Sequence, residues 1–199
     1  MKAVNKERML AEFKEVVAVP CHTLQERPVF ELLRVKLEAL GFTVEEDDAG
    51  EKLGGNCGNL WAFLPGNKAG ATSVLFSAHM DGVEPCGGTT VVQKDGYLYS
   101  DGTTILGGDD KSGVVGIIEG VRMIVEENAE HGDIQILFTI AEEGGAMGGV
   151  VVNINVAASG GVEAILEQLT EASRNGVVQA LEFANLNYKV GQSQQGYSV

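Results

Sequence analysis

Basic residues are scarce in this chain of 199 residues: 14 Lys and Arg stand against 28 Asp and Glu, which gives a net charge of −14. A surface with this excess of acid repels phosphate groups, so it argues against nucleic acid and against anionic membranes as partners. The excess does not identify a partner by itself. The apolar fraction of 44% is ordinary, and it leaves enough apolar side chains to bury a core.

Cysteine is also scarce. The 3 cysteines, Cys21, Cys57 and Cys86, lie far apart and show no C-x-x-C spacing. This argues against a disulfide framework and against a structural zinc knuckle. Reduced thiols are typical of the cytoplasm, so a cytoplasmic location is predicted. No apolar run is long enough to span a bilayer, and the first segment, MKAVNKERMLAEFKEVV, lacks the apolar centre of a signal peptide.

Helical and strand patterns alternate along the first part of the chain. Apolar residues at helical spacing predict a helix that ends before Pro20, and a second one over 27–42, with Pro28 near its start and Gly41 as its stop. Asp95-Gly96 between two runs of strand formers predicts a hairpin over 89–102. The remaining segments are expected as a helix over 112–128 and as strands over 42–47, 60–66, 72–78 and 132–140.

This alternation predicts an α/β fold with a mainly parallel mixed sheet flanked by helices. In such sheets ligands bind beyond the carboxyl ends of the strands. Several polar residues follow predicted strands at that point, which gives the first support for a functional site.

His79 and Asp81 follow the apolar run TSVLFSA, which is typical of a buried strand. Residues two apart on a strand share a face, so the imidazole and the carboxylate point the same way. A carboxylate beside an imidazole fixes its tautomer, as is usual for metal-binding histidines. A polar strand end without a metal is the other interpretation, and these two residues alone do not choose between them.

Asp109 and Asp110 lie in a glycine-flanked loop before the apolar helix over 112–128. Either acid can cap that helix and oppose its dipole. Lys111 can be a solvated charge or a partner that keeps an aspartate ionised. A phosphate-binding loop is excluded, because two acids separate Gly108 from Lys111 and would repel phosphate.

Glu142 and Glu143 are adjacent at the end of the strand over 132–140, and glycines follow them. They can be two solvated loop acids. Adjacent carboxylates usually diverge, however, so one can bind a metal ion while the other acts as a general base on a water molecule.

Together these clusters offer one imidazole and several carboxylates but no thiolate. Such ligands suit a two-metal hydrolytic centre with zinc, and manganese or cobalt are alternatives. A thiol protease is disfavoured: Cys21 and His22 are neighbours in a loop, and no third orienting group is evident.

Three stretches carry a family resemblance: SAHMDGVEP, YSDGTTILGGDDKSGVVGIIE and HGDIQILFTIAEEGG. In their order and spacing they resemble the co-catalytic zinc peptidases, most closely the peptidase T (tripeptide aminopeptidase)-like proteins. The resemblance covers about residues 1–147. It implies hydrolysis of the peptide bonds of small peptides at a two-zinc centre.

Carried over position by position, the resemblance implies a role for each candidate residue. His79 is a ligand of one zinc ion, and Asp81 is the acid that orients it. Asp109 bridges both ions, Glu142 is the general base that activates the bridging water, and Glu143 binds the second ion. Asp110 has no ligand role, and His131 lies in a connecting loop.

The chain departs from the family in its later part. Family members carry a further carboxylate ligand, a final histidine ligand and an inserted lid or dimerisation domain, whereas here no histidine follows His131. We therefore expect residues 1–147 to form the N-terminal part of a metallopeptidase-like catalytic domain and residues 148–199 to be a divergent tail packed on it. The alternative function is a catalytically incomplete remnant that binds metal or a partner. An exposed sheet edge in such a fold would favour a homodimer.

Overall fold

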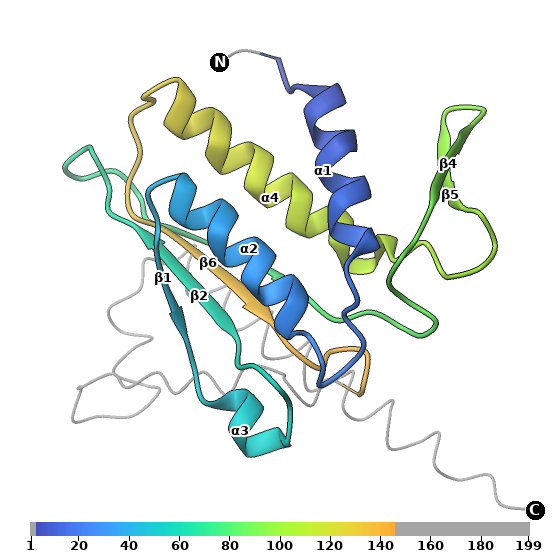
Figure 1. The fold of residues 1–199 in the computed structure, drawn as a ribbon. Coiled ribbons are helices and arrows are strands. Elements are labelled where there is room, and N and C mark those ends of the chain that lie inside the picture. The colour runs from blue at the N-terminus through green and yellow to red at the C-terminus, as the bar shows by residue number, and fades with distance from the viewer. Residues whose placement is uncertain (1–2, 146–199) are drawn as a thin grey trace, which may run out of the picture. The chain divides into compact units, whose positions relative to one another are not determined.

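The computed structural model describes residues 3–145 of the chain (Figure 1). This part contains four helices and six strands. In chain order they are α1 (Lys6–Ala18), α2 (Arg27–Ala39), β1 (Thr43–Glu46), α3 (Ala49–Leu53), β2 (Leu60–Leu64), β3 (Val74–His79), β4 (Val91–Lys94), β5 (Tyr97–Ser100), α4 (Gly108–Glu126) and β6 (Ile134–Thr139).

The main sheet has the strand order β1-β2-β6-β3. Its mixed character and the helices packed on it confirm the predicted α/β class. The predicted predominance of parallel pairing is wrong for the described strands, because β1–β2 and β2–β6 are antiparallel and only β3–β6 is parallel. A parallel pair needs a long crossover, and the connection through α4 supplies one between β3 and β6. The short segment around α3 instead returns the chain antiparallel.

Helices α2 and α4 cover the same face of this sheet (Figure 1). Alternate residues of β6, Ile134, Ile136 and Phe138, point to that face and are buried in one hydrophobic cluster with Leu33 of α2 and Ile118 of α4. Since side chains alternate along a strand, the residues between them point to the opposite face. The core therefore lies between the helices and one face of the sheet, and it fixes the ends of β3 and β6 side by side.

The local signals for helix ends and turns are confirmed. Pro28 stands in the first turn of α2, and Gly41 after it has a φ of +90°, which a residue with a side chain rarely adopts. β4 and β5 form the predicted hairpin, with Asp95 and Gly96 at φ values of +53° and +81°. Both central residues of a type I′ turn need positive φ, which Asp-Gly tolerates.

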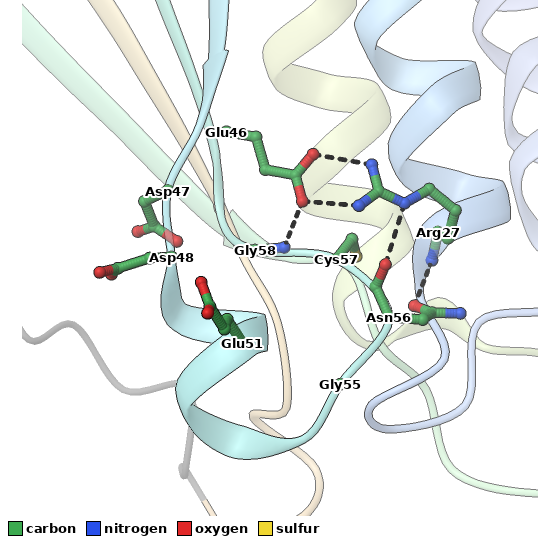
Figure 2. A pocket seen from close by; sticks show the side chains of 9 residues that line it. All are labelled: Arg27, Glu46, Asp47, Asp48, Glu51, Gly55, Asn56, Cys57 and Gly58. Carbon is green, nitrogen blue, oxygen red and sulfur yellow. Dashed lines mark hydrogen bonds and ion pairs between the residues drawn. The ribbon is translucent and has the colours of Figure 1, made fainter.

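The glycine-rich stretch 48–59 contains the short helix α3. An ion pair anchors this stretch to α2: Arg27 donates from both terminal nitrogens to Glu46, at 2.7 and 2.6 Å, and from Nε to the carbonyl oxygen of Asn56 (Figure 2). These contacts close the loop against the start of α2.

β3 is less buried than its sequence suggests. Val74, Leu75 and Phe76 are 41%, 55% and 38% exposed, and only Ala78 and His79 at its end are buried. β3 is one of the two edge strands of the described sheet, so its outer side has no strand neighbour there.

No helix in the described part is both long enough and apolar enough to cross a membrane. The predicted tail over 148–199, and with it the expected domain boundary, lies outside the described residues.

Candidate metal centre

His79 is the last residue of β3, and Asp81 lies beyond it with a fully buried side chain. His79 Nδ1 is 3.2 Å from Asp81 Oδ1, so the pair has the contact that orients an imidazole. With the Nδ1 proton directed at the carboxylate, Nε2 is left to bind another group. The sequence placed both side chains on one face, and the structure agrees.

The two adjacent aspartates in the first turn of α4 have different roles. Asp110 Oδ1 accepts from the backbone N–H of Gly113 at 3.0 Å, so Asp110 is the helix cap. Asp109 has non-helical backbone angles, and its side chain is 88% exposed. Its Oδ1 lies 3.2 Å from His79 Nε2. Of the two capping candidates, only Asp109 reaches the histidine.

Lys111 is neither a solvated charge nor an aspartate partner. It is buried, and its Nζ donates to the backbone carbonyl oxygens of Met80 and Asp81, at 2.5 and 2.7 Å. These bonds join the start of α4 to the end of β3, so they fix the distance between the segments that carry Asp109 and His79.

Glu142 and Glu143 lie just after β6, next to the end of β3. Glu142 Oε2 is 3.9 Å from His79 Nε2. Glu143 belongs with His79 and Asp109 to a group whose ligand atoms all lie within 4.8 Å of one another. It is the one group of three or more such residues among the described ones.

Asp81 also holds the backbone of both glutamates. Its Oδ1 accepts from the N–H of Glu142 at 3.0 Å, and its Oδ2 accepts from the N–H of Glu143 and from the hydroxyl of Thr23, both at 2.9 Å. Sequence reasoning assigned to Asp81 only the contact with His79. The backbone contacts were missed because they depend on how the turn after β6 folds, which no short motif encodes.

The charges around the site move two pKa values in opposite directions. Burial lowers the pKa of His79, but the Asp81 and Asp109 carboxylates outweigh this effect and raise it to about 9. Burial raises the pKa of Asp81, but hydrogen bonds from His79, from the two glutamate amides and from Thr23 hold it below its ordinary value. The site therefore attracts positive charge.

The donor atoms suit a divalent metal ion. One imidazole nitrogen and carboxylate oxygens within 4.8 Å of one another match the ligands of zinc, and manganese or cobalt accept them as well. An open pocket of about 240 Å³ lies beside the group, with Glu143 on its wall together with Thr23, Gly82 and Glu84. A molecule bound at the metal ligands can extend into this pocket.

The other two histidines do not belong to this group of ligand atoms, although His22 lines the pocket beside it. His131 Nδ1 contacts the carbonyl oxygen of Gly132 at 2.7 Å, at the opposite end of β6 from the glutamates. His22 Nδ1 lies 3.6 Å from Glu84. Its neighbour Cys21 is buried, and burial raises the pKa of this thiol to about 11, which does not suit a nucleophile.

Comparison with known proteins places these features in a family. The sequence profile of "Peptidase family M20/M25/M40" matches residues 75–193, more than half of the chain, and extends past the segment that carries the motifs. The chain is 41% identical over 145 residues to the uncharacterized protein YqjE of Bacillus subtilis, an alignment that covers 73% of this chain and 39% of YqjE. It is 55% identical over 47 residues to peptidase T of Fusobacterium nucleatum, which covers 23% of this chain and 11% of that protein.

Solved structures give the same result. The aminopeptidase PepT of Bacillus cereus superimposes with a TM-score of 0.71 at 42% identity, over 73% of this chain and 39% of that one. A tripeptidase of Staphylococcus aureus gives 0.70 at 36% identity, over 74% and 39%. The alignments with YqjE and with PepT each cover 73% of this chain. They cover only 39% of the length of either relative. The shared motifs, the shared fold and the profile match together show that the chain belongs to the peptidase family M20/M25/M40.

Proposed function

We propose that this protein is a metal-dependent hydrolase that cleaves peptide bonds of small peptides, in the manner of a tripeptide aminopeptidase. The observation that carries the proposal is the convergence of His79, Asp109 and Glu143 within 4.8 Å beside Glu142, from segments far apart in the sequence. The similarity to an aminopeptidase and a tripeptidase supports the choice of substrate class.

His79, Asp109 and Glu143 would hold the metal, which is zinc in this proposal. Bound there, the metal would supply the positive charge that polarises a peptide carbonyl group. The Asp109 carboxylate is exposed, and its 3.2 Å contact with His79 uses Oδ1, so Oδ2 would be left for a second ion. Asp81 keeps the His79 ring in one orientation and one tautomer.

Glu142 is proposed as the general base. It lies beside the ligand group without belonging to it, and its side chain is 51% exposed, so Oε2 is free to take a proton from a water molecule and to pass it to the leaving amine. A general base of this kind contributes about 10²–10⁴-fold to the rate. Glu143 would bind the metal while Glu142 takes the proton, so each carboxylate would have its own task.

A catalytically incomplete remnant was the alternative, and the comparisons do not favour it. The remaining predictions on partners and location belong to this proposal: a small peptide as substrate, no nucleic acid or membrane as partner, and a cytoplasmic location. The net charge of −14 and the free cysteines support them.

We also propose that two copies associate through β3. In the described sheet β3 is an outer strand, and Val74, Leu75 and Phe76 are exposed along it. An exposed apolar edge strand is a template for pairing with a second chain. Sedimentation velocity at several concentrations tests this: a dimer that Leu75→Lys dissociates is expected, and a monomer at all concentrations contradicts it.

The activity is tested with the full chain purified without chelator. Metal content is measured by mass spectrometry, and hydrolysis of a tripeptide panel is followed with added zinc, manganese or cobalt. Glu142→Gln should reduce turnover about 10²–10⁴-fold while the metal content stays unchanged. Glu130→Gln, an exposed change in the loop before β6, is the matched control and should leave both unchanged. Metal-loaded protein without detectable turnover on any tripeptide would contradict the proposal.

A further inference from the structure

Four consecutive backbone N–H groups, from residue 140 to residue 143, each donate to a side-chain oxygen. None of these acceptors lies close in sequence to the residue it binds. The bonds are Ile140 N to Asn59 Oδ1 at 3.0 Å, Ala141 N to Glu26 Oε1 at 3.0 Å, Glu142 N to Asp81 Oδ1 at 3.0 Å, and Glu143 N to Asp81 Oδ2 at 2.9 Å.

Asn59 is itself held in place. Its Nδ2 donates to Asp47 Oδ2 at 2.8 Å, which leaves its Oδ1 to face the N–H of Ile140. Asp47 Oδ1 also accepts from the N–H of Asn59 at 2.8 Å. Asn59, Glu26 and Asp81 are all buried, and together they form a support of side-chain acceptors for the turn that carries the two glutamates.

Glu26 is the least expected member of this support. Its side chain is fully buried at the start of α2, and its Oε1 accepts from the N–H of Leu24 at 2.9 Å as well as from that of Ala141. Its Oε2 has no hydrogen-bond partner, and it is the one such buried side-chain atom in the described part of the chain.

An unpaired buried oxygen costs stability, and a hydrocarbon side chain of similar volume would avoid that cost. Core packing therefore does not explain a glutamate at this position. The bond to Ala141 does offer an explanation, because Ala141 has a φ of +55°. A residue with a side chain rarely adopts this conformation and keeps it only when its surroundings enforce it.

The conformation of Ala141 sets the direction of the two residues that follow it. We propose that Glu26 is a positioning residue of the metal centre: by accepting the Ala141 N–H, it holds the turn that places Glu142 and Glu143 at the site. Glu26 touches neither metal nor substrate in this role. The part of the proposal that concerns metal affinity rests on the proposed function, whereas the part that concerns the turn does not.

The test compares Glu26→Leu, which removes the acceptor at similar volume, with Glu26→Gln, which keeps one carbonyl oxygen. Leu33→Ala is the matched control, because Leu33 is buried on the same helix and lies outside this support. It should destabilise the fold without disturbing the turn. If Glu26→Leu does not fold, Glu26→Asp replaces it, since its shorter side chain withdraws the acceptor from Ala141.

Two readouts are measured on the full chain. Zinc affinity should fall about tenfold or more in Glu26→Leu, as for other groups that orient metal ligands, and should stay near the wild-type value in Glu26→Gln and Leu33→Ala. The amide hydrogen exchange rate at residues 141–143, divided by that of the Leu137 amide in β6, should rise about tenfold or more in Glu26→Leu. It should stay near the wild-type value in the other two variants.

An exchange ratio and a zinc affinity in Glu26→Leu that equal those of the wild type would overturn the proposal, and so would an equal loss of affinity in Leu33→Ala. If the wild-type chain binds no zinc, the proposed metal centre fails. The exchange measurement then still decides the role of Glu26 in the turn, so the two failures are distinguishable.

Discussion

The proposed metal centre has two sides that are built differently. On the β6 side, the turn with Glu142 and Glu143 is bonded to buried side chains, and Asp81 among them is fully buried. On the α4 side, Asp109 extends a side chain that is 88% exposed and contacts His79. The difference shows that separate groups position the ligand residues and bind the ion. Buried acceptors hold the backbone of the ligand residues, and exposed carboxylate oxygens remain available for an ion. Substitutions on the two sides should therefore affect stability and metal binding differently.

The largest loss of stability is expected for Asp81→Asn. The amide group would place an N–H₂ where the carboxylate now accepts from Thr23, His79 and two backbone amides, so at least one buried donor is left unpaired. We expect the free energy of unfolding to fall by about 3 kcal/mol, together with a loss of zinc binding. Urea denaturation measures the first and calorimetric titration the second.

Asp95→Asn in the β4–β5 hairpin is the control, since asparagine tolerates the φ of +53° equally well. Its unfolding free energy should match that of the wild type. A stable Asp81→Asn protein would show that the buried side of the centre does not depend on this carboxylate.

A smaller loss of unfolding free energy is expected at low pH, when the carboxylate of Asp47 becomes protonated. Burial raises the pKa of Asp47, but hydrogen bonds from Ala49, Asn59 and Trp61 outweigh this and hold it below its ordinary value. A carboxyl group with a lowered pKa in the folded state stabilises the protein above its unfolded pKa of about 4, and this contribution is lost as the pH falls through the folded value.

The unfolding free energy of wild type and of Asp47→Asn should therefore differ at pH 7 and converge below about pH 4. Asp48→Asn, a change at the exposed neighbour that pairs with Lys52, serves as the comparison and should show little difference at either pH. A difference for Asp47→Asn that persists unchanged at low pH would mean that its charge does not support Asn59.

The smallest effect on stability is expected for Asp109→Asn. Because the side chain is exposed, the unfolding free energy should change by no more than about 0.5 kcal/mol. Zinc affinity should nevertheless fall strongly. Loss of a group that only orients a metal ligand lowers the affinity about 10–100-fold, and loss of Asp109, a ligand itself, should lower it further. Asp110→Asn is the matched control, because asparagine also caps a helix, so both quantities should stay unchanged. Equal zinc affinities in the two variants would contradict the assignment of Asp109.

Much of the site could be predicted from the sequence because strand ends are easy to recognise. His79 and Glu142 each follow an apolar run, and in an α/β fold such ends meet at one edge of the sheet. Asp109 and Asp110 could not be told apart without the family resemblance, because both are capping residue types, and only their side-chain contacts in the folded protein distinguish them.

The support beneath the site was not predictable. Glu26 and Asn59 contact residues 115 and 81 positions away, and no spacing pattern announces such bonds. Lys111 was expected as a surface charge or an aspartate partner, since no sequence pattern identifies a buried lysine that donates to backbone carbonyl oxygens. The exposure of β3 was missed because an apolar run in the sequence does not distinguish an edge strand from a central strand.

The most direct test of the account is a crystal structure of the chain grown with zinc, with the ions located by anomalous scattering at the zinc edge. The account predicts zinc within about 2.0–2.2 Å of His79 Nε2 and of oxygens of Asp109 and Glu143, with Glu142 beside it but not bound. Zinc bound elsewhere, with these three side chains uncoordinated at saturating metal, would contradict it.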